Sequence, residues 1–188
     1  MRWIWLDKIV ELTKAERMVA IKNVTAAEDV LHDHFAAAAG GGRAEQGYHG
    51  GPTGAGPDAA HPAYPVMPNS LIIEGFAQTA GILVGHAKDF KEKVILAKIG
   101  KASFTGVNAV PGTTVRYTAE LRHLDDRGAS TRGSVDLLDP LTGKSQPLAE
   151  IEMMFSHIDQ NMKGIAFPEH NFVFTDQFMD LLKRSGID

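Results

Sequence analysis

Residues 65–81, with the sequence PVMPNSLIIEGFAQTAG, are expected to form the central element of this protein. The prolines of PVMP favour an extended backbone, and the side-chain oxygen of Asn69 or Ser70 is placed to cap a helix. The residues that follow are apolar on nearly every side, which is typical of a buried helix. The sequence therefore predicts a helix that begins near residue 69 and ends near Phe90.

One narrow stripe of this helix has a different character. Glu74 and Gln78 fall on it at helical spacing, together with Gly81 and Gly85. A carboxylate is rarely buried unless it is paired or has a function. The glycines leave room for another group to approach closely. Glu74 is therefore the first residue of functional interest, with a structural carboxylate bonded to the backbone or to Gln78 as the alternative.

The composition indicates one soluble globular domain. The chain has 188 residues, of which 44% are hydrophobic and 22% are charged. Its net charge of −4 gives no basic signature for nucleic acid, and the absence of cysteine excludes disulfides and thiolate chemistry. The apolar run in residues 3–6 is too short to span a bilayer or to form a signal-peptide core. We therefore expect a cytoplasmic protein without stable membrane insertion.

The segments before the helix predict a β-hairpin, a helical turn and a long insertion. Residues 3–12 and 17–24 are rich in strand-forming side chains and flank a polar turn. Thr25 and Glu28 have the spacing of a capping box, which favours a short helical turn. Residues 36–63 are rich in alanine and glycine and carry too little large apolar surface to offset their ordering entropy. This insertion is interpreted as a flexible loop, with a lid as the alternative.

Beyond the helix the hydrophobic period becomes that of β-strands. Residues 115–121 alternate between apolar and polar side chains, as in a half-buried strand. Further strands are predicted at residues 94–104, 131–138 and 148–157. The result is an antiparallel sheet around one buried helix, an α+β arrangement. A C-terminal extension, residues 158–188, is expected to contain an amphipathic helix at residues 176–184.

Several motifs, taken in chain order, resemble those of the FabZ-type 3-hydroxyacyl-[acyl-carrier-protein] dehydratases. They are NVT at residues 23–25, HDHF at 32–35, PVMP at 65–68, LIIE and QTAG within 71–81, and AKIGKASF at 97–104 leading to VPG at 110–112. The resemblance extends from about Trp5 to Ser156, and we expect residues 1–188 to form a single domain of this kind. It implies the hotdog fold, a curved antiparallel β-sheet wrapped around a long central α-helix. The order of helices and strands predicted from periodicity agrees with this fold.

The resemblance also implies a reaction and a pair of catalytic residues. His34 corresponds to the family's catalytic histidine and Glu74 to its catalytic carboxylate. The implied reaction dehydrates (3R)-hydroxyacyl chains on acyl carrier protein to trans-2-enoyl products, in fatty-acid or related lipid biosynthesis. A histidine can take the proton from C2, and a protonated carboxyl group can give one to the departing hydroxyl. The two residues are implied to come from different protomers of a homodimer, with a trimer of dimers left open. No metal or organic cofactor is implied.

Four further residues are expected to contribute to substrate binding. Backbone N–H groups at the helix start, around Asn69 and Ser70, suit the thioester oxygen as it gains negative charge. Gln78 is expected to support the site by hydrogen bonding, and Phe104 to line an acyl tunnel, with core packing as the alternative. A group of lysines can either receive the acidic carrier protein or form a solvated face; these are Lys88, Lys91, Lys93, Lys98 and Lys101.

The chain departs from the family pattern after the histidine motif and at the helix start. The long insertion replaces the usual Pro-Gly, so His61 is a rival for His34 as the catalytic histidine. Asn69 stands where the family often has glycine. These departures leave two alternatives open, a hotdog acyl-thioesterase and a non-catalytic acyl-binding hotdog protein. His32 and His34 have the spacing of a metal pair, but no third ligand follows at a convincing spacing, so no metal site is predicted.

Overall fold

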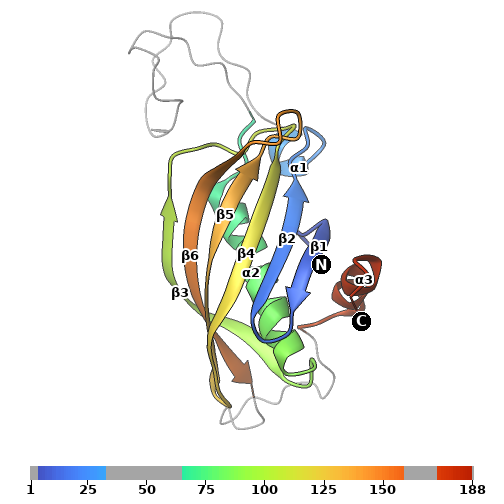
Figure 1. Cartoon of the computed structure of the whole chain (residues 1–188), viewed down its shortest axis with the longest axis vertical. Coiled ribbons are helices and arrows are strands. Elements are labelled where there is room, and N and C mark those ends of the chain that lie inside the picture. Colours follow the sequence, from blue (N-terminus) through green and yellow to red (C-terminus); the bar gives the residue numbers. More distant parts are fainter. Residues whose placement is uncertain (1–3, 33–64, 159–172, 188) are drawn as a thin grey trace, which may run out of the picture.

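The computed structural model describes residues 4–32, 65–158 and 173–187. Its strands form one six-stranded antiparallel sheet in the order β1-β2-β4-β5-β6-β3, with helix α2 packed against it (Figure 1). The elements are β1 (Lys8–Thr13), β2 (Arg17–Asn23), α1 (Asp29–His32), α2 (Asn69–Ala87), β3 (Lys93–Phe104), β4 (Thr114–Leu124), β5 (Gly128–Leu138), β6 (Ser145–Ile158) and α3 (Asp176–Arg184). The α+β arrangement predicted from the sequence is confirmed.

The core lies between α2 and the inward face of the sheet. Strand β4 shows the predicted alternation, because Val115, Tyr117 and Ala119 are buried while Glu120 is exposed. The neighbouring strands contribute buried side chains at alternate positions in the same way, among them Val135, Leu137, Ile151, Met153 and Phe155. On α2, Phe76 and Leu83 are fully buried. The apolar surface of the central helix is therefore covered by the strands that follow it in the sequence.

The predicted hairpin of β1 and β2 is confirmed, but its first strand begins later than expected. Residues 4–7 precede β1 in an irregular path, whereas the sequence predicted a strand from residue 3. The backbone N–H of Trp5 donates to Oε1 of Gln78 on α2, at 2.9 Å. Because this donor is used by the helix, Trp5 is unavailable for the sheet. Trp5, which the sequence placed in a strand, instead connects the segment before β1 to the central helix.

The start of α2 differs from the prediction. Asn69 is already the first helical residue, and Pro68 occupies the capping position with φ −58° and ψ 139°. No side chain caps this end, and the carbonyl of Pro68 accepts hydrogen bonds from the backbone N–H groups of Leu71 and Ile72. The expectation that Asn69 or Ser70 caps the helix was therefore wrong. A capping side chain must precede the first helical residue, and proline has none to offer.

The end of α2 and the turn before α1 also correct the sequence analysis. The helix ends at Ala87, earlier than expected, because Asp89 and Phe90 adopt left-handed backbone conformations with φ near 54° and 55°. Such residues terminate a helix. Before α1, the carboxylate of Glu28 binds the ammonium of Lys22 at 2.6 Å. The predicted short helical turn is present as α1, but the carboxylate of Glu28 pairs with Lys22 on β2.

The glycines of α2 receive aromatic rings from the same chain. A Cβ atom at Gly75 would overlap the ring of Tyr117, and one at Gly85 would overlap the ring of Phe174. At Gly81 the nearest atom would be Cε1 of Phe155, at an ordinary contact distance of 3.6 Å. The close approach predicted for this helix therefore occurs, and it serves to pack the helix within its own fold.

Helix α3 is confirmed with the predicted bounds, and it packs beside strand β1 (Figure 1). Leu181 and Leu182 of this helix are buried and belong to the hydrophobic core. The backbone N–H of Ile9 on β1 donates to the hydroxyl oxygen of Ser185 at 3.0 Å. Since β1 is an edge strand, α3 covers one border of the sheet and satisfies a backbone donor there.

Replacing Ser185 with alanine is expected to weaken this cover. The change leaves the part-buried N–H of Ile9 without its acceptor, which costs about 1 kcal/mol of folding stability. Amide hydrogen exchange should show its largest acceleration at Ile9, with no more than the roughly fivefold change that about 1 kcal/mol of global stability implies at the amides of β5. Lys183→Ala, at an exposed position of the same helix, is the control. Unchanged protection at Ile9 would contradict the role assigned to Ser185.

Candidate functional site

The candidate site centres on Glu74, which α2 holds half-buried beside the sheet. Oε1 of Glu74 accepts a hydrogen bond from Nε2 of Gln78 at 2.8 Å. The two residues are one helical turn apart, so the spacing that placed them on one stripe also brings their side chains into contact. Among the described residues, Gln78 is the hydrogen-bond partner of the Glu74 carboxylate.

The orientation of the Gln78 amide is determined by the hydrogen bond that its oxygen accepts. Gln78 is only 8% exposed, and its Oε1 accepts the backbone N–H of Trp5. A backbone N–H can only donate, so the amide oxygen must face Trp5 and the amide nitrogen must face Glu74. Trp5, Gln78 and Glu74 therefore form one directed chain of hydrogen bonds. This chain fixes the carboxylate of Glu74 in place, which a catalytic acid or base requires.

Tyr117, on β4, packs next to Glu74, although its sequence pattern predicted only a strand position. Its side chain is fully buried, and its ring meets α2 at Gly75, the residue after Glu74. Burial is the main reason that the pKa of the Tyr117 hydroxyl is raised well above its ordinary value; the negative charges of Asp7 and Glu74 add to this, while an interaction with Trp5 opposes it. Tyr117 is therefore a neutral packing partner of the helical turn that carries Glu74.

The other expected substrate-binding residues lie at the start of α2 and at the end of β3. Asn69 and Ser70 are exposed in the first turn of α2. Phe104 is the last residue of β3 and packs, half-buried, against the core. The backbone N–H of Met67 donates to the carbonyl of Ala109 at 2.9 Å, which ties the loop after β3 to the helix entry.

The histidines expected in catalysis are not among the described residues. His34 and its rival His61 both lie outside them, as does the insertion at residues 36–63. Within the described ranges, no group of three or more His, Asp or Glu side chains is placed to hold a metal ion. In the same part of the chain, no helix is long and apolar enough to cross a membrane.

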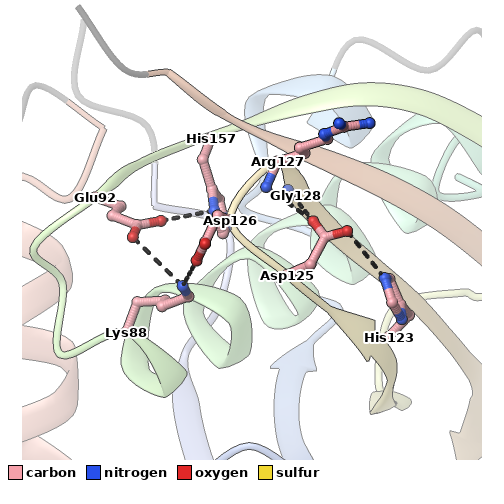
Figure 2. A network of polar contacts seen from close by, with 8 residues as sticks. All are labelled: Lys88, Glu92, His123, Asp125, Asp126, Arg127, Gly128 and His157. Atoms are coloured by element: carbon pink, nitrogen blue, oxygen red, sulfur yellow. Dashed lines mark hydrogen bonds and ion pairs between the residues drawn. The ribbon is translucent and has the colours of Figure 1, made fainter.

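A second polar cluster lies at the other end of α2, away from Glu74 (Figure 2). The ammonium of Lys88 is 3.5 Å from Glu92 and 3.4 Å from Asp126. Glu92 in turn contacts Nδ1 of the buried His157 at 2.6 Å. Lys88 was one of the lysines considered for carrier-protein docking. Its ion pairs show that it joins the end of α2 to the turn between β4 and β5.

The comparisons with known proteins agree with this architecture. A family model described as a FabA-like domain matches residues 59–137. Among solved structures, the conserved protein PA5202 of Pseudomonas aeruginosa superposes with a TM-score of 0.53 at 14% identity, covering 80% of this chain and 87% of that one. An acyl-CoA hydrolase of Staphylococcus aureus superposes with a TM-score of 0.52 at 13% identity, covering 90% of this chain and 84% of that one. The sheet and central helix are those of a hotdog fold.

Sequence relatives then identify the family. The chain is 33% identical to the 3-hydroxyacyl-[acyl-carrier-protein] dehydratase FabZ of Koribacter versatilis over 138 residues, which are 72% of this chain and 71% of that protein. It is 28% identical to the FabZ of Listeria monocytogenes serotype 4b (strain F2365) over 158 residues, which are 84% and 87%. This protein belongs to the FabZ family. The resemblance drawn from its motifs is confirmed.

Proposed function

We propose that this protein dehydrates (3R)-hydroxyacyl chains carried on acyl carrier protein and gives trans-2-enoyl products, in fatty-acid or related lipid biosynthesis. Its FabZ relatives are named 3-hydroxyacyl-[acyl-carrier-protein] dehydratases. The observation that carries the proposal is the Glu74 carboxylate, held half-buried on the central helix of a FabZ-family fold and oriented by Gln78. A positioned carboxyl group inside a protein is suited to proton transfer.

In the proposed reaction, His34 takes a proton from C2 of the acyl chain. The electron pair of that C–H bond forms the C2–C3 double bond, and the C3–O bond breaks. Glu74 gives a proton to the departing oxygen, directly or through a water molecule, so that water leaves. The thioester oxygen gains negative charge during proton removal. The first N–H groups of α2, around Asn69 and Ser70, have no partner within the helix and can stabilise that charge.

Hydration of an enoyl thioester tests this proposal directly. Purified protein is added to a trans-2-enoyl chain on acyl carrier protein, and the absorbance of the conjugated thioester and the release of free thiol are followed together. We expect the chromophore to disappear without thiol release, and His34→Ala to abolish this while His61→Ala does not. Thiol release would show a thioesterase instead. Binding of the thioester without either change would show a non-catalytic acyl-binding protein.

The proposed active unit is a homodimer, and strand β3 supports this. It is an edge strand of 12 residues, and most of its side chains are exposed, including Leu96 at 42% and Ile99 at 43%. A long edge strand with exposed apolar side chains is suited to pairing with another chain. A dimer through this edge would place two sheets side by side. The light-scattering measurement described next also distinguishes one dimer from a trimer of dimers.

Introducing a charge on this edge is expected to separate the protomers. Ile99→Arg places a cation where the proposed partner strand would lie, which favours a monomer in light scattering coupled to size exclusion. Leu141→Arg is the matched control, because Leu141 is 95% exposed in the turn between β5 and β6. A wild-type monomer, or an Ile99→Arg dimer of unchanged stability, would contradict pairing through β3.

A further inference from the structure

Lys22, on strand β2, is a buried lysine. It is 8% exposed, although lysine is almost never buried unless it is paired. Its ammonium lies 2.6 Å from Oε1 of Glu28 and 3.4 Å from Oδ1 of Asp7. The same nitrogen stands 5.0 Å from the centre of the Trp5 ring, within cation–π range. One charged group thus contacts three residues from the segments on either side of the hairpin.

Asp7 is fixed to β2 by more than this ion pair. Its backbone N–H donates to the carbonyl of Ile21 at 2.9 Å, and its Oδ2 accepts the backbone N–H of Asn23 at 2.6 Å. These bonds hold Asp7 against β2. Lys22 adds the contact to the Trp5 side chain, which the backbone bonds do not reach.

Trp5 is also where the hydrogen-bond chain to Glu74 begins. Its backbone N–H orients the Gln78 amide, and that amide donates to Glu74. If Trp5 moves, Gln78 loses the donor that selects its orientation. Its amide can then turn and present oxygen to the carboxylate, which replaces an attractive contact with a repulsive one. The position of Trp5 is therefore transmitted to the carboxylate through the side chain of Gln78.

We infer that Lys22 is a positioning residue for Glu74, acting through Trp5 and Gln78. This rests on the proposed function, because it assigns Lys22 a part in the same dehydration. Lys22 touches no substrate. Its ammonium balances Asp7 and Glu28 and holds the Trp5 ring, so that the Trp5 N–H points at Gln78 and the catalytic carboxylate keeps one orientation.

Charge-removing and charge-keeping variants of Lys22 test the inference. Lys22→Met retains an unbranched side chain of similar length but removes the cation. We expect kcat to fall about tenfold with little change in KM, because a small displacement of a catalytic group lowers the rate strongly. Lys22→Arg retains the charge and should recover most of the lost rate. Lys14→Met removes a lysine–carboxylate pair at the other end of α2 and should leave kcat unchanged.

A double-variant comparison shows whether the effect passes through Gln78. In a Gln78→Met background, where the chain to Glu74 is already broken, Lys22→Met should lower kcat no further. Two losses that multiply would overturn the inference, because Lys22 would then act by another route.

A spectroscopic measurement keeps the test independent of turnover. The side-chain amide resonances of Gln78 in ¹H–¹⁵N spectra should shift in Lys22→Met and stay in place in Lys14→Met. Unmoved resonances would overturn the inference even if activity falls. An inactive wild type with shifted resonances in Lys22→Met would count against the proposed dehydratase and leave the connection between Lys22 and Gln78 established.

Discussion

Glu74→Gln is expected to lower the rate of enoyl-thioester hydration by about a thousandfold, within the range that general acid–base groups contribute. Glutamine has nearly the same shape as glutamate, but its amide cannot exchange a proton with the substrate. Its carbonyl oxygen can still accept the hydrogen bond from Nε2 of Gln78. The thermal unfolding midpoint should therefore stay close to that of the wild type. The loss is expected in kcat, with KM little changed.

The control for this variant is a carboxylate that lies on the surface. Glu150 forms an exposed ion pair with Lys101, and Glu150→Gln should leave both the rate and the stability unchanged. If Glu74→Gln kept more than about a tenth of the wild-type rate, Glu74 would not be the proton donor. The structural alternative for this carboxylate would then account for its hydrogen bond to Gln78.

Gly75→Ala is expected to cause the largest loss of stability among the changes considered. The added methyl group would overlap the ring of Tyr117, which is fully buried. Overpacking of this kind costs about 3 kcal/mol. For a chain of 188 residues, that corresponds to a fall of roughly 6–12 °C in the unfolding midpoint. Thermal denaturation followed by circular dichroism measures it.

Gly81→Ala provides a matched control on the same helix. Its new methyl group would meet Phe155 at 3.6 Å, an ordinary contact, and alanine favours a helix over glycine by up to about 1 kcal/mol. This variant should be as stable as the wild type or more so. Combining Gly75→Ala with Tyr117→Leu should cost less than the sum of the two single changes, because the smaller side chain relieves the overlap. Strict additivity would show that Tyr117 is not the obstacle.

Periodicity and motifs predicted most of the fold. The alternation in β4, the hairpin and the bounds of α3 follow from local patterns, and the structure shows each of them. The cap of α2 was predicted wrongly. The sequence shows which side chains are able to cap a helix, here Asn69 and Ser70, but not at which residue the helical backbone begins. Trp5 was assigned to a strand on propensity, which the hydrogen bond to Gln78 overrides.

The candidate site was predictable only in part. Helical spacing placed Glu74 and Gln78 on one stripe, and the hydrogen bond between them follows from it. Lys22 gave no such signal, because a lysine in a strand is ordinarily exposed. Its burial depends on Asp7 and Glu28, which come from either side of the hairpin and meet it only after folding. The role of His34 stays a prediction.

The cover that α3 provides for β1 has a consequence for how many copies can join. Strand β1 ends the sheet on one side, and there the C-terminal helix occupies the border and Ser185 takes up a backbone donor. Strand β3 ends it on the other side. A sheet with two open borders can extend without limit, copy after copy, into a fibre. With one border blocked by α3, the proposed edge pairing through β3 would stop at two copies. Helix α3 would thus make the stoichiometry of the proposed contact finite.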